Sequence, residues 1–280
     1  MKVKNLKEFY NIFSSKKDDF DILISDLNFE MYSLKNITDL AEIFDFNAKI
    51  EILNEIPVMK FSKLKEQYKF DHEDRERYGK DSLYSNISKI YEPYYYDGLY
   101  QLFVNNCKLY NILDIGINSG DEFTILKDIL GNKVESITGI DYSQSALDIT
   151  KMKHPESLLI NHDLRDYKSL KLEKKFNLLY SVGTLQSTTY DGKEFFRYAF
   201  QNWLTDDADI ILGFPNCRYI DGVQKYGARV KNNNYYDLGL LFKDISFYKQ
   251  YLNQHKKRVR IFGKYYIFVV GTSFIMKEES

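Results

Sequence analysis

Short apolar segments alternate with amphipathic, helix-patterned segments over residues 111–215, and this alternation is the strongest constraint on the fold. The apolar segments are NILDIG, ESITGID, SLLINHD, FNLLYSVG and ADIILGFP, and three of them lead into EFTILKDIL, SQSALDITKMK and KEFFRYAFQNWL. Apolar strands separated by helices are typical of parallel βαβ units. The pattern predicts an α/β fold with a doubly wound, mostly parallel, Rossmann-like sheet.

Both ends of the chain depart from this rhythm. Residues 1–84 predict a small α/β addition, whose last strand-like segment closes near Pro57, and a charged connector, FDHEDRERYGKD. Residues 85–280 are the predicted main domain, with an insertion at about 217–236. At its C-terminal end, a helical face precedes two strand-like segments that meet across Gly263, so we expect the sheet to end with an antiparallel strand.

The segment LDIGINSGD, residues 113–121, runs from an apolar strand through a glycine turn into a helix. Gly116 and Gly120 supply contact space or a positive φ, and Asn118 between them is a residue type that tolerates the left-handed region. Such turns let the backbone approach a ligand closely. Glycine turns are also common as purely structural features, so the turn needs support from other residues.

That support comes from carboxylates at three successive predicted strand ends: Asp114, Asp141 and Asp163. If the sheet is doubly wound, these ends converge on one crevice. Asp141 follows Gly120 by 21 residues, where a carboxylate reaches a ribose diol. Asp121 opens the following helix and would repel a diphosphate, whereas a cationic sulfonium would be attracted. The charge pattern therefore favours S-adenosylmethionine over a dinucleotide.

From about Tyr110 to Cys217 the chain resembles the class I S-adenosylmethionine-dependent methyltransferases. LDIGINSGD is similar to the first motif of that family, GIDYSQSALD to the second, NHDLRDY to the third, and FNLLYSVGTLQS to the fourth strand and its loop. The resemblance implies the following contacts with the cofactor: Gly116 and the adjoining backbone, with Asp114, Asn118 and Gly120, around the methionine part; Asp141 at the ribose; Asp163 and Leu164 at the adenine, flanked by Tyr142; and Gly183 and Thr184 near the methyl group. The family's usual glycine at position 118 is asparagine here.

Composition limits the partners, metal sites and cellular location that we expect. With 39 basic and 40 acidic residues, no global field draws the chain to nucleic acid or anionic lipid. Two cysteines and four scattered histidines predict no metal site. The mean hydropathy is −0.44, and the N-terminal segment has no signal-peptide pattern. We therefore expect a cytoplasmic protein without a membrane partner, and the sequence is compatible with a homodimer.

The acceptor side is suggested by local charge. Residues 215–264 contain eleven basic and three acidic side chains. Within the predicted insertion, Arg218 and Arg229 beside Tyr219 form a candidate clamp for a small anionic acceptor. GFPNCRYIDG resembles bacterial methyltransferases found with surface-polysaccharide genes, which implies a phosphoryl- or phosphoramidate-bearing sugar or nucleotide precursor. A general base is not evident in the sequence.

Other functions stay open at this point. A nucleic-acid methyltransferase would use the same basic region along a phosphate backbone, although no RNA-binding module or NPPY-type tetrapeptide supports it. A non-catalytic partner subunit would bind S-adenosylmethionine without turnover. A dehydrogenase is disfavoured by Asn118 and Asp121.

Overall fold

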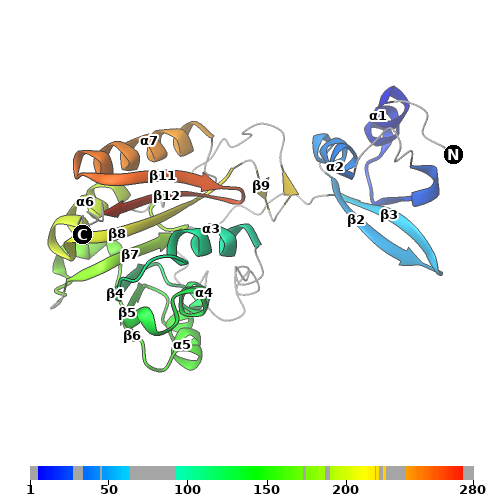
Figure 1. Ribbon diagram of the computed structural model, residues 1–280. Coiled ribbons are helices and arrows are strands. Elements are labelled where there is room, and N and C mark those ends of the chain that lie inside the picture. The colour runs from blue at the N-terminus through cyan, green and yellow to red at the C-terminus, as the bar shows by residue number, and fades with distance from the viewer. Residues whose placement is uncertain are drawn as a thin grey trace. The chain divides into compact units, whose positions relative to one another are not determined.

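The computed structural model describes residues 6–27, 34–44, 46–63, 93–172, 175–186, 190–217, 219–220, 223–224 and 238–273. The chain divides into two compact units. We call Asp71–Asn216 with Leu238–Ser280 the α/β unit, and Met1–Phe70 with Cys217–Asp237 the N-terminal unit. Figure 1 shows both, and each is described here by itself.

The α/β unit is built on a seven-stranded sheet in the order β11-β12-β8-β7-β4-β5-β6. Strands β4 to β8 are mutually parallel where they pair, and β12 is antiparallel to both β8 and β11. The bounds are β4 Tyr110–Ile115, β5 Val134–Asp141, β6 Leu158–Asn161, β7 Phe176–Val182, β8 Leu204–Pro215, β11 Lys257–Gly263 and β12 Tyr266–Ser273. This arrangement confirms the predicted fold class, including the antiparallel C-terminal strand.

Helices cover both faces of this sheet (Figure 1). One face carries α3, α4 and α5, whose Leu99, Phe123 and Leu147 belong to a core cluster with strand residues. The other carries α6 and α7, where the ring centroids of Phe196 and Tyr248 lie 5.1 Å apart. The helices are α3 Pro93–Phe103, α4 Asp121–Leu130, α5 Gln144–Lys153, α6 Gly192–Asn202 and α7 Leu238–Gln254, with short 3-10 turns η3 Gly131–Lys133 and η4 Leu164–Ser169.

The parallel strands β4, β5, β6, β7 and β8 all end on the same side of the sheet. We call this side the carboxyl edge, and the opposite side, where these strands begin, the amino edge. Because β12 is antiparallel to β8 and Tyr266 pairs with Pro215, the turn between β11 and β12 also lies at the carboxyl edge. The turn after β4, the end of β5 and the hairpin turn before β12 therefore share one edge, as the doubly wound arrangement requires.

The N-terminal unit packs two helices on a three-stranded antiparallel sheet in the order β1-β3-β2. Phe13 lies at the centre of its core, with the rings of Phe9, Phe20 and Phe61 within about 5.5 Å of its ring. The elements are α1 Leu6–Ser15, β1 Phe20–Leu23, η1 Ile24–Asp26, α2 Leu34–Ile43, β2 Phe46–Leu53 and β3 Ile56–Lys63, with a short pair of strands, β9 Tyr219–Ile220 and β10 Val223–Gln224.

The predicted α/β character of the addition is confirmed, but one detail of it is wrong. The strand region does not close near Pro57, because β3 continues through that residue to Lys63. Pro57 is opposite Ile52 and lies beyond the end of β1, where its missing N–H breaks no ladder bond to that strand. The charged connector at 70–81 lies outside the described residues.

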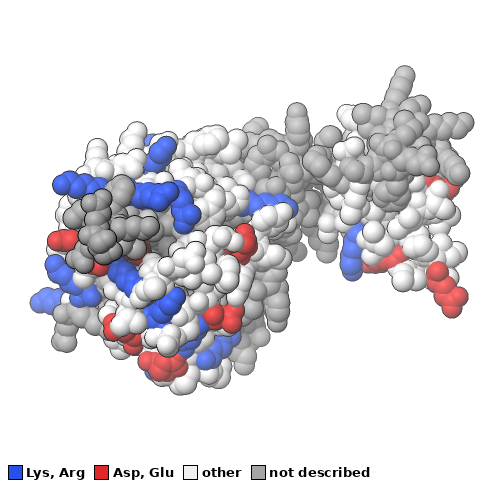
Figure 2. Space-filling view, in the orientation of Figure 1, with Lys and Arg blue, Asp and Glu red and all other residues white. Residues whose placement is uncertain are grey.

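Two surface properties bear on the possible partners. Figure 2 shows basic and acidic side chains interspersed on the visible face of the α/β unit. Among the helices that the structure describes, none has the length and apolar character to cross a membrane.

Candidate functional site

The turn after β4 has the backbone conformation that its sequence predicts. Gly116, Asn118 and Gly120 have φ values of 76°, 50° and 76°. At Gly116 a Cβ atom would lie 2.0 Å from Thr184 Oγ1, so a side chain has no room there. The N–H of Gly116 donates to Ile140 O at 2.8 Å, which ties the turn to β5. Glycine is therefore needed at 116 both for the φ value and for the close approach of the loop after β7.

Helix α5 holds the carbonyl groups of this turn. Thr150 Oγ1 donates to Asn118 O at 2.7 Å, Lys153 Nζ donates to Ser119 O at 3.0 Å, and His154 Nε2 lies 3.0 Å from Gly120 O. Three consecutive carbonyls thus face α5. The sequence analysis missed these three residues, although their spacing of three and four places them on one helix face.

Asp141, at the end of β5, fixes the other side of the turn. Its Oδ2 accepts the N–H of Asn118 and its Oδ1 accepts the N–H of Ser143, both at 2.9 Å. The side chain is buried, and burial raises its pKa although the backbone donors act against the shift. The structure therefore brings together two residues, Asn118 and Asp141, that the sequence singled out separately.

Further acids gather around this point. Asp114 and Glu122 are both buried, at 1% and 2% exposed. Burial is the main cause of the raised pKa of Asp141 and of the pKa values of Tyr95 and Tyr180, which lie well above the usual range, and the negative charge of Glu122 adds to each shift. Glu122 was not predicted, since nothing in its helical position distinguishes it from a solvent-facing acid. Within the described residues, no group of three or more His, Cys, Asp or Glu side chains is arranged to hold a metal ion.

The predicted adenine side contains Tyr142, Asp163 and Leu164. The N–H of His162 donates to Asp141 O at 2.9 Å, so the chain after β6 lies beside the end of β5. Asp163 caps η4 by accepting the N–H of Arg165 at 2.9 Å, and it also pairs with the Arg165 guanidinium. Leu164 is buried and Tyr142 is half-buried. The contact of these residues with adenine stays a prediction.

Gly183 follows β7 and has a φ of 75°. Its N–H donates to Gly213 O at 2.8 Å, which joins the ends of β7 and β8. The nearest heavy atom to a Cβ at this position is Cε1 of Tyr266, at 4.0 Å. Among the described residues, a methyl group at Gly183 would therefore meet only Tyr266, in the hairpin between β11 and β12.

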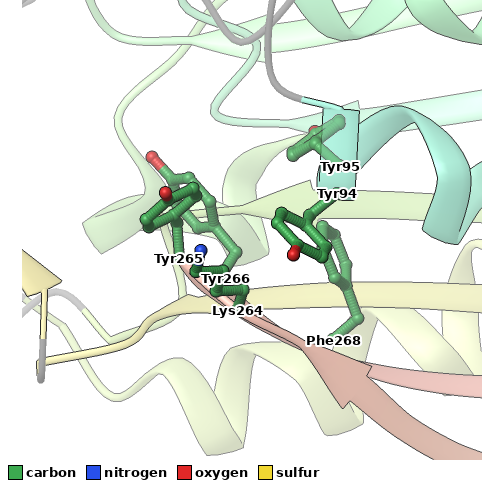
Figure 3. A pocket seen from close by; sticks show the side chains of 6 residues that line it. All are labelled: Tyr94, Tyr95, Lys264, Tyr265, Tyr266 and Phe268. Atoms are coloured by element: carbon green, nitrogen blue, oxygen red, sulfur yellow. The ribbon is translucent and has the colours of Figure 1, made fainter. Parts of the chain in front are cut away.

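A shallow pocket lies at that hairpin (Figure 3). The Lys264 ammonium is 4.7 Å from the ring centroid of Tyr94 and 4.9 Å from that of Tyr265. Asn216, just after β8, holds the turn, because its N–H donates to Tyr265 O and its Nδ2 donates to Lys264 O. The lining residues are Tyr94, Tyr95, Lys264, Tyr265, Tyr266 and Phe268. The pocket thus presents aromatic walls and one cation at the carboxyl edge.

Tyr95 connects this pocket to the acidic part of the edge. Its hydroxyl is hydrogen-bonded to that of Tyr180, and Tyr180 lies opposite Asp114 in the register of β7 and β4. The sequence gave no sign of Tyr180 or Lys264, whose neighbours are distant in the chain.

The predicted acceptor clamp is mostly not described. Arg218 and Arg229 lie outside the described residues, and Tyr219 is described only as the first backbone position of β9. Their contact with an acceptor stays a prediction.

The sequence matches no protein-family model and no curated protein. Solved structures do match the chain. A SAM-dependent methyltransferase from Aquifex aeolicus is 14% identical, with 64% of this chain and 89% of that chain covered and a TM-score of 0.45. One from Clostridium acetobutylicum is also 14% identical, with 64% and 90% covered and a TM-score of 0.44. The plantazolicin methyltransferase BpumL, solved with SAH, is 13% identical, with 63% and 80% covered and a TM-score of 0.46. At these values a functional conclusion must rest on the site itself.

Proposed function

We propose that this chain is an S-adenosylmethionine-dependent methyltransferase acting on a small anionic acceptor. The observation that carries the proposal is the glycine turn after β4, which is held by Asp141 on one side and by α5 on the other. A turn fixed in this way is preorganised, so little ordering remains to oppose ligand binding.

The residues present fit this cofactor. Asn118 Oδ1 is buried and has no hydrogen-bond partner in the described part of the chain, so it offers an acceptor. Gly183 leaves space that a Cβ would partly fill. At the start of α4, the carboxylate of Asp121 pairs with Lys153 Nζ at 3.0 Å, so the buried acid Glu122 is the one that opposes a diphosphate at this helix N-terminus and favours a sulfonium and an ammonium. We assign Asp141 to the ribose diol and the Asp114–Gly120 turn to the methionine end.

When bound, S-adenosylmethionine supplies a methyl group on a positively charged sulfur. The chain's own contribution is to align an acceptor with that methyl and to exclude competing water. An ionised oxygen needs no general base, only a cation that orients it. Lys264, held beside two aromatic rings, supplies such a cation at the carboxyl edge, and Arg218 and Arg229 are the further candidates. We propose a phosphoryl- or phosphoramidate-bearing sugar or nucleotide precursor of surface polysaccharide as the acceptor class.

The test is calorimetric titration of the full chain with S-adenosylmethionine, S-adenosylhomocysteine (SAH) and NADH. Asp141→Ala should weaken SAH binding by about 1.5 to 3 kcal/mol, the scale of hydrogen bonds to a charged group. Asp148→Ala is the matched control, since Asp148 is an exposed acid on α5 that contacts Gln144. Absence of SAH binding, or saturable NADH binding, would overturn the proposal.

Measurements of methyl transfer and of nucleic-acid binding distinguish the remaining alternatives for the function. Formation of SAH should be accelerated by phosphate monoesters more than by neutral alcohols of the same size, and Lys264→Met should raise the acceptor KM far more than the cofactor KM. Steeply salt-dependent RNA or DNA binding would favour a nucleic-acid methyltransferase. Tight SAH binding without turnover on any acceptor would indicate a cofactor-binding partner subunit.

A further inference from the structure

Strand β2 forms one edge of the three-stranded sheet in the N-terminal unit. It is eight residues long and contains no proline, and no strand of the described chain pairs with its outer side. Long edge strands of this kind are templates for pairing with another chain. Natural edges are commonly protected by a bulge, a proline, a very short strand or charged side chains, and of these Phe46–Leu53 has only the charges of Lys49 and Glu51, which are of opposite sign.

One face of β2 is more apolar than a solvated surface requires. Phe46 is buried and Ala48 half-buried beneath the helices, but Ile50 and Ile52, which follow on the same face, are 51% and 74% exposed. Figure 1 shows the far end of the β2–β3 hairpin extending beyond α1 and α2 of the same unit. The core face therefore continues past the helices that cover it.

The turn of the hairpin determines which backbone groups of β2 point outward. Asn54 and Glu55 have φ values of 49° and 69°, and Leu53 pairs with Ile56, so this is a two-residue turn of the type I′ kind. The two residues that flank such a turn form backbone hydrogen bonds with each other, and along the rest of the hairpin every second residue pair does the same. The N–H and C=O groups of odd-numbered residues of β2 therefore point toward β3, and those of even-numbered residues point outward. Pro57, which has no N–H, lies opposite even-numbered Ile52, as this phase requires.

We propose that β2 pairs antiparallel with β2 of a second copy of this chain, about a two-fold axis at Ile50. This register places Ile50 opposite the partner's Ile50, where the outward backbone groups exchange hydrogen bonds. Lys49 then lies opposite the partner's Glu51, and Glu51 opposite the partner's Lys49. Ile52 lies opposite the partner's Ala48.

Charge selects this register. Two-fold axes at Lys49 or Glu51 place like charges directly opposite each other, which destabilises a strand pair. Axes at Ala48 or Ile52 pair fewer residues and remove both Lys49–Glu51 matches. The axis at Ile50 alone combines outward backbone groups, opposite charges and apolar contact. Within one chain Glu51 already lies 3.3 Å from Lys49 and 3.4 Å from Lys60, so its carboxylate is positioned on that face.

The experiment is sedimentation equilibrium of the full-length chain over a concentration series. Wild type should show a monomer–dimer equilibrium. Lys49→Glu should raise the dimer dissociation constant about tenfold or more, since it creates two opposed acid pairs, and Glu51→Lys should do the same with two opposed basic pairs. The double variant Lys49→Glu with Glu51→Lys should restore the wild-type constant.

Circular dichroism and thermal melting control for folding, because exposed charge changes should leave the monomer intact. The rescue by the double variant distinguishes paired strands from a general effect of charge. A strictly monomeric wild type, a dimer insensitive to both single changes, or a double variant as weak as the singles would each overturn the proposal. This test does not depend on cofactor binding, so it is separate from the proposed function.

Discussion

Buried carboxylates lie at both edges of the seven-stranded sheet, but their partners differ between the two edges. At the amino edge Asp209 accepts from Tyr110 Oη at 2.7 Å and from the N–H of Ser273 at 3.2 Å, with Lys108 Nζ at 3.9 Å. At the carboxyl edge Asp141 accepts only backbone N–H groups from the described chain, and burial raises its pKa, with a smaller contribution from the neighbouring acid Glu122.

This difference distinguishes carboxylates that stabilise the fold from carboxylates that we expect to bind a ligand. A buried acid beside a cation and a hydroxyl is satisfied within the chain, and such networks stabilise the fold. Acids that lie near one another create negative potential that a cationic ligand relieves. We therefore expect changes at the amino edge to affect the free energy of unfolding, and changes at the carboxyl edge to affect ligand affinity and turnover.

The largest effect on stability should come from Asp209→Ala. This change leaves the buried Tyr110 hydroxyl and the Ser273 N–H without their acceptor, and each such loss costs about 1 to 3 kcal/mol. We expect urea unfolding to report a loss of about 3 kcal/mol. Calorimetry should give an SAH affinity within about twofold of wild type. An affinity loss as large as that of Asp141→Ala would break the distinction between the edges.

The second effect is expected at the glycine turn. Gly116→Ala should weaken SAH binding about tenfold to a hundredfold, because its Cβ would meet Thr184 Oγ1 at 2.0 Å and displace the turn that Asp141 holds. Gly131→Ala is the matched control: Gly131 also has positive φ, at 57°, but nothing lies within 4 Å of its Cβ position. The control should lose about 1 to 3 kcal/mol of stability from backbone strain and no affinity. Equal affinity losses in the two variants would show that strain alone is responsible.

Gly183→Ala sharpens the comparison within the carboxyl edge. Alanine at this φ of 75° should cost about 1 to 3 kcal/mol of stability from backbone strain, but its Cβ would meet Tyr266 only at 4.0 Å, so SAH affinity should change by no more than a few-fold. Turnover should fall about tenfold or more, since a small displacement of the acceptor from the methyl group is costly. Single-turnover kinetics with saturating cofactor would measure it. If the turnover of Gly183→Ala equals that of wild type, methyl transfer does not take place next to Gly183.

The sequence predicted features that depend on neighbours in the chain. The alternation of strands and helices, the positive φ of Gly116 and the antiparallel end of the sheet follow from local pattern, and each is confirmed. The missed features depend on contacts between distant segments. Thr150 and His154 contact the turn only because α5 packs beside it, and Lys264 reaches Tyr94 from about 170 residues away along the chain.

Asp163 shows a third case, in which the local pattern was ambiguous. An acid just after a strand serves a ligand and a following helical turn equally well. In the structure Asp163 caps η4 by accepting the N–H of Arg165, and the contact of Asp163 with adenine stays a prediction.

The smallest effect expected is a pH dependence of stability at His154. Gly120 O can only accept, so His154 Nε2 carries the proton and Nδ1, 3.2 Å from Lys127 Nζ, accepts. Burial, followed by the charge of Lys127, lowers the pKa of His154 in the folded chain. The unfolded chain takes up a proton near the ordinary value of about 6.5. Stability should therefore be complete above that value and decline as the pH falls below it, by at most about 1.4 kcal/mol per pH unit.

Denaturant titrations at several values between about pH 7.5 and 5.5 would measure this slope. His154→Gln keeps a donor for Gly120 O but cannot titrate, so it should flatten the curve. Asp141 acts in the opposite direction, since its raised pKa makes the folded chain bind a proton more tightly, but in a lower pH window set by a carboxyl group. An unchanged slope in His154→Gln would mean that another group causes the pH dependence of stability in this range.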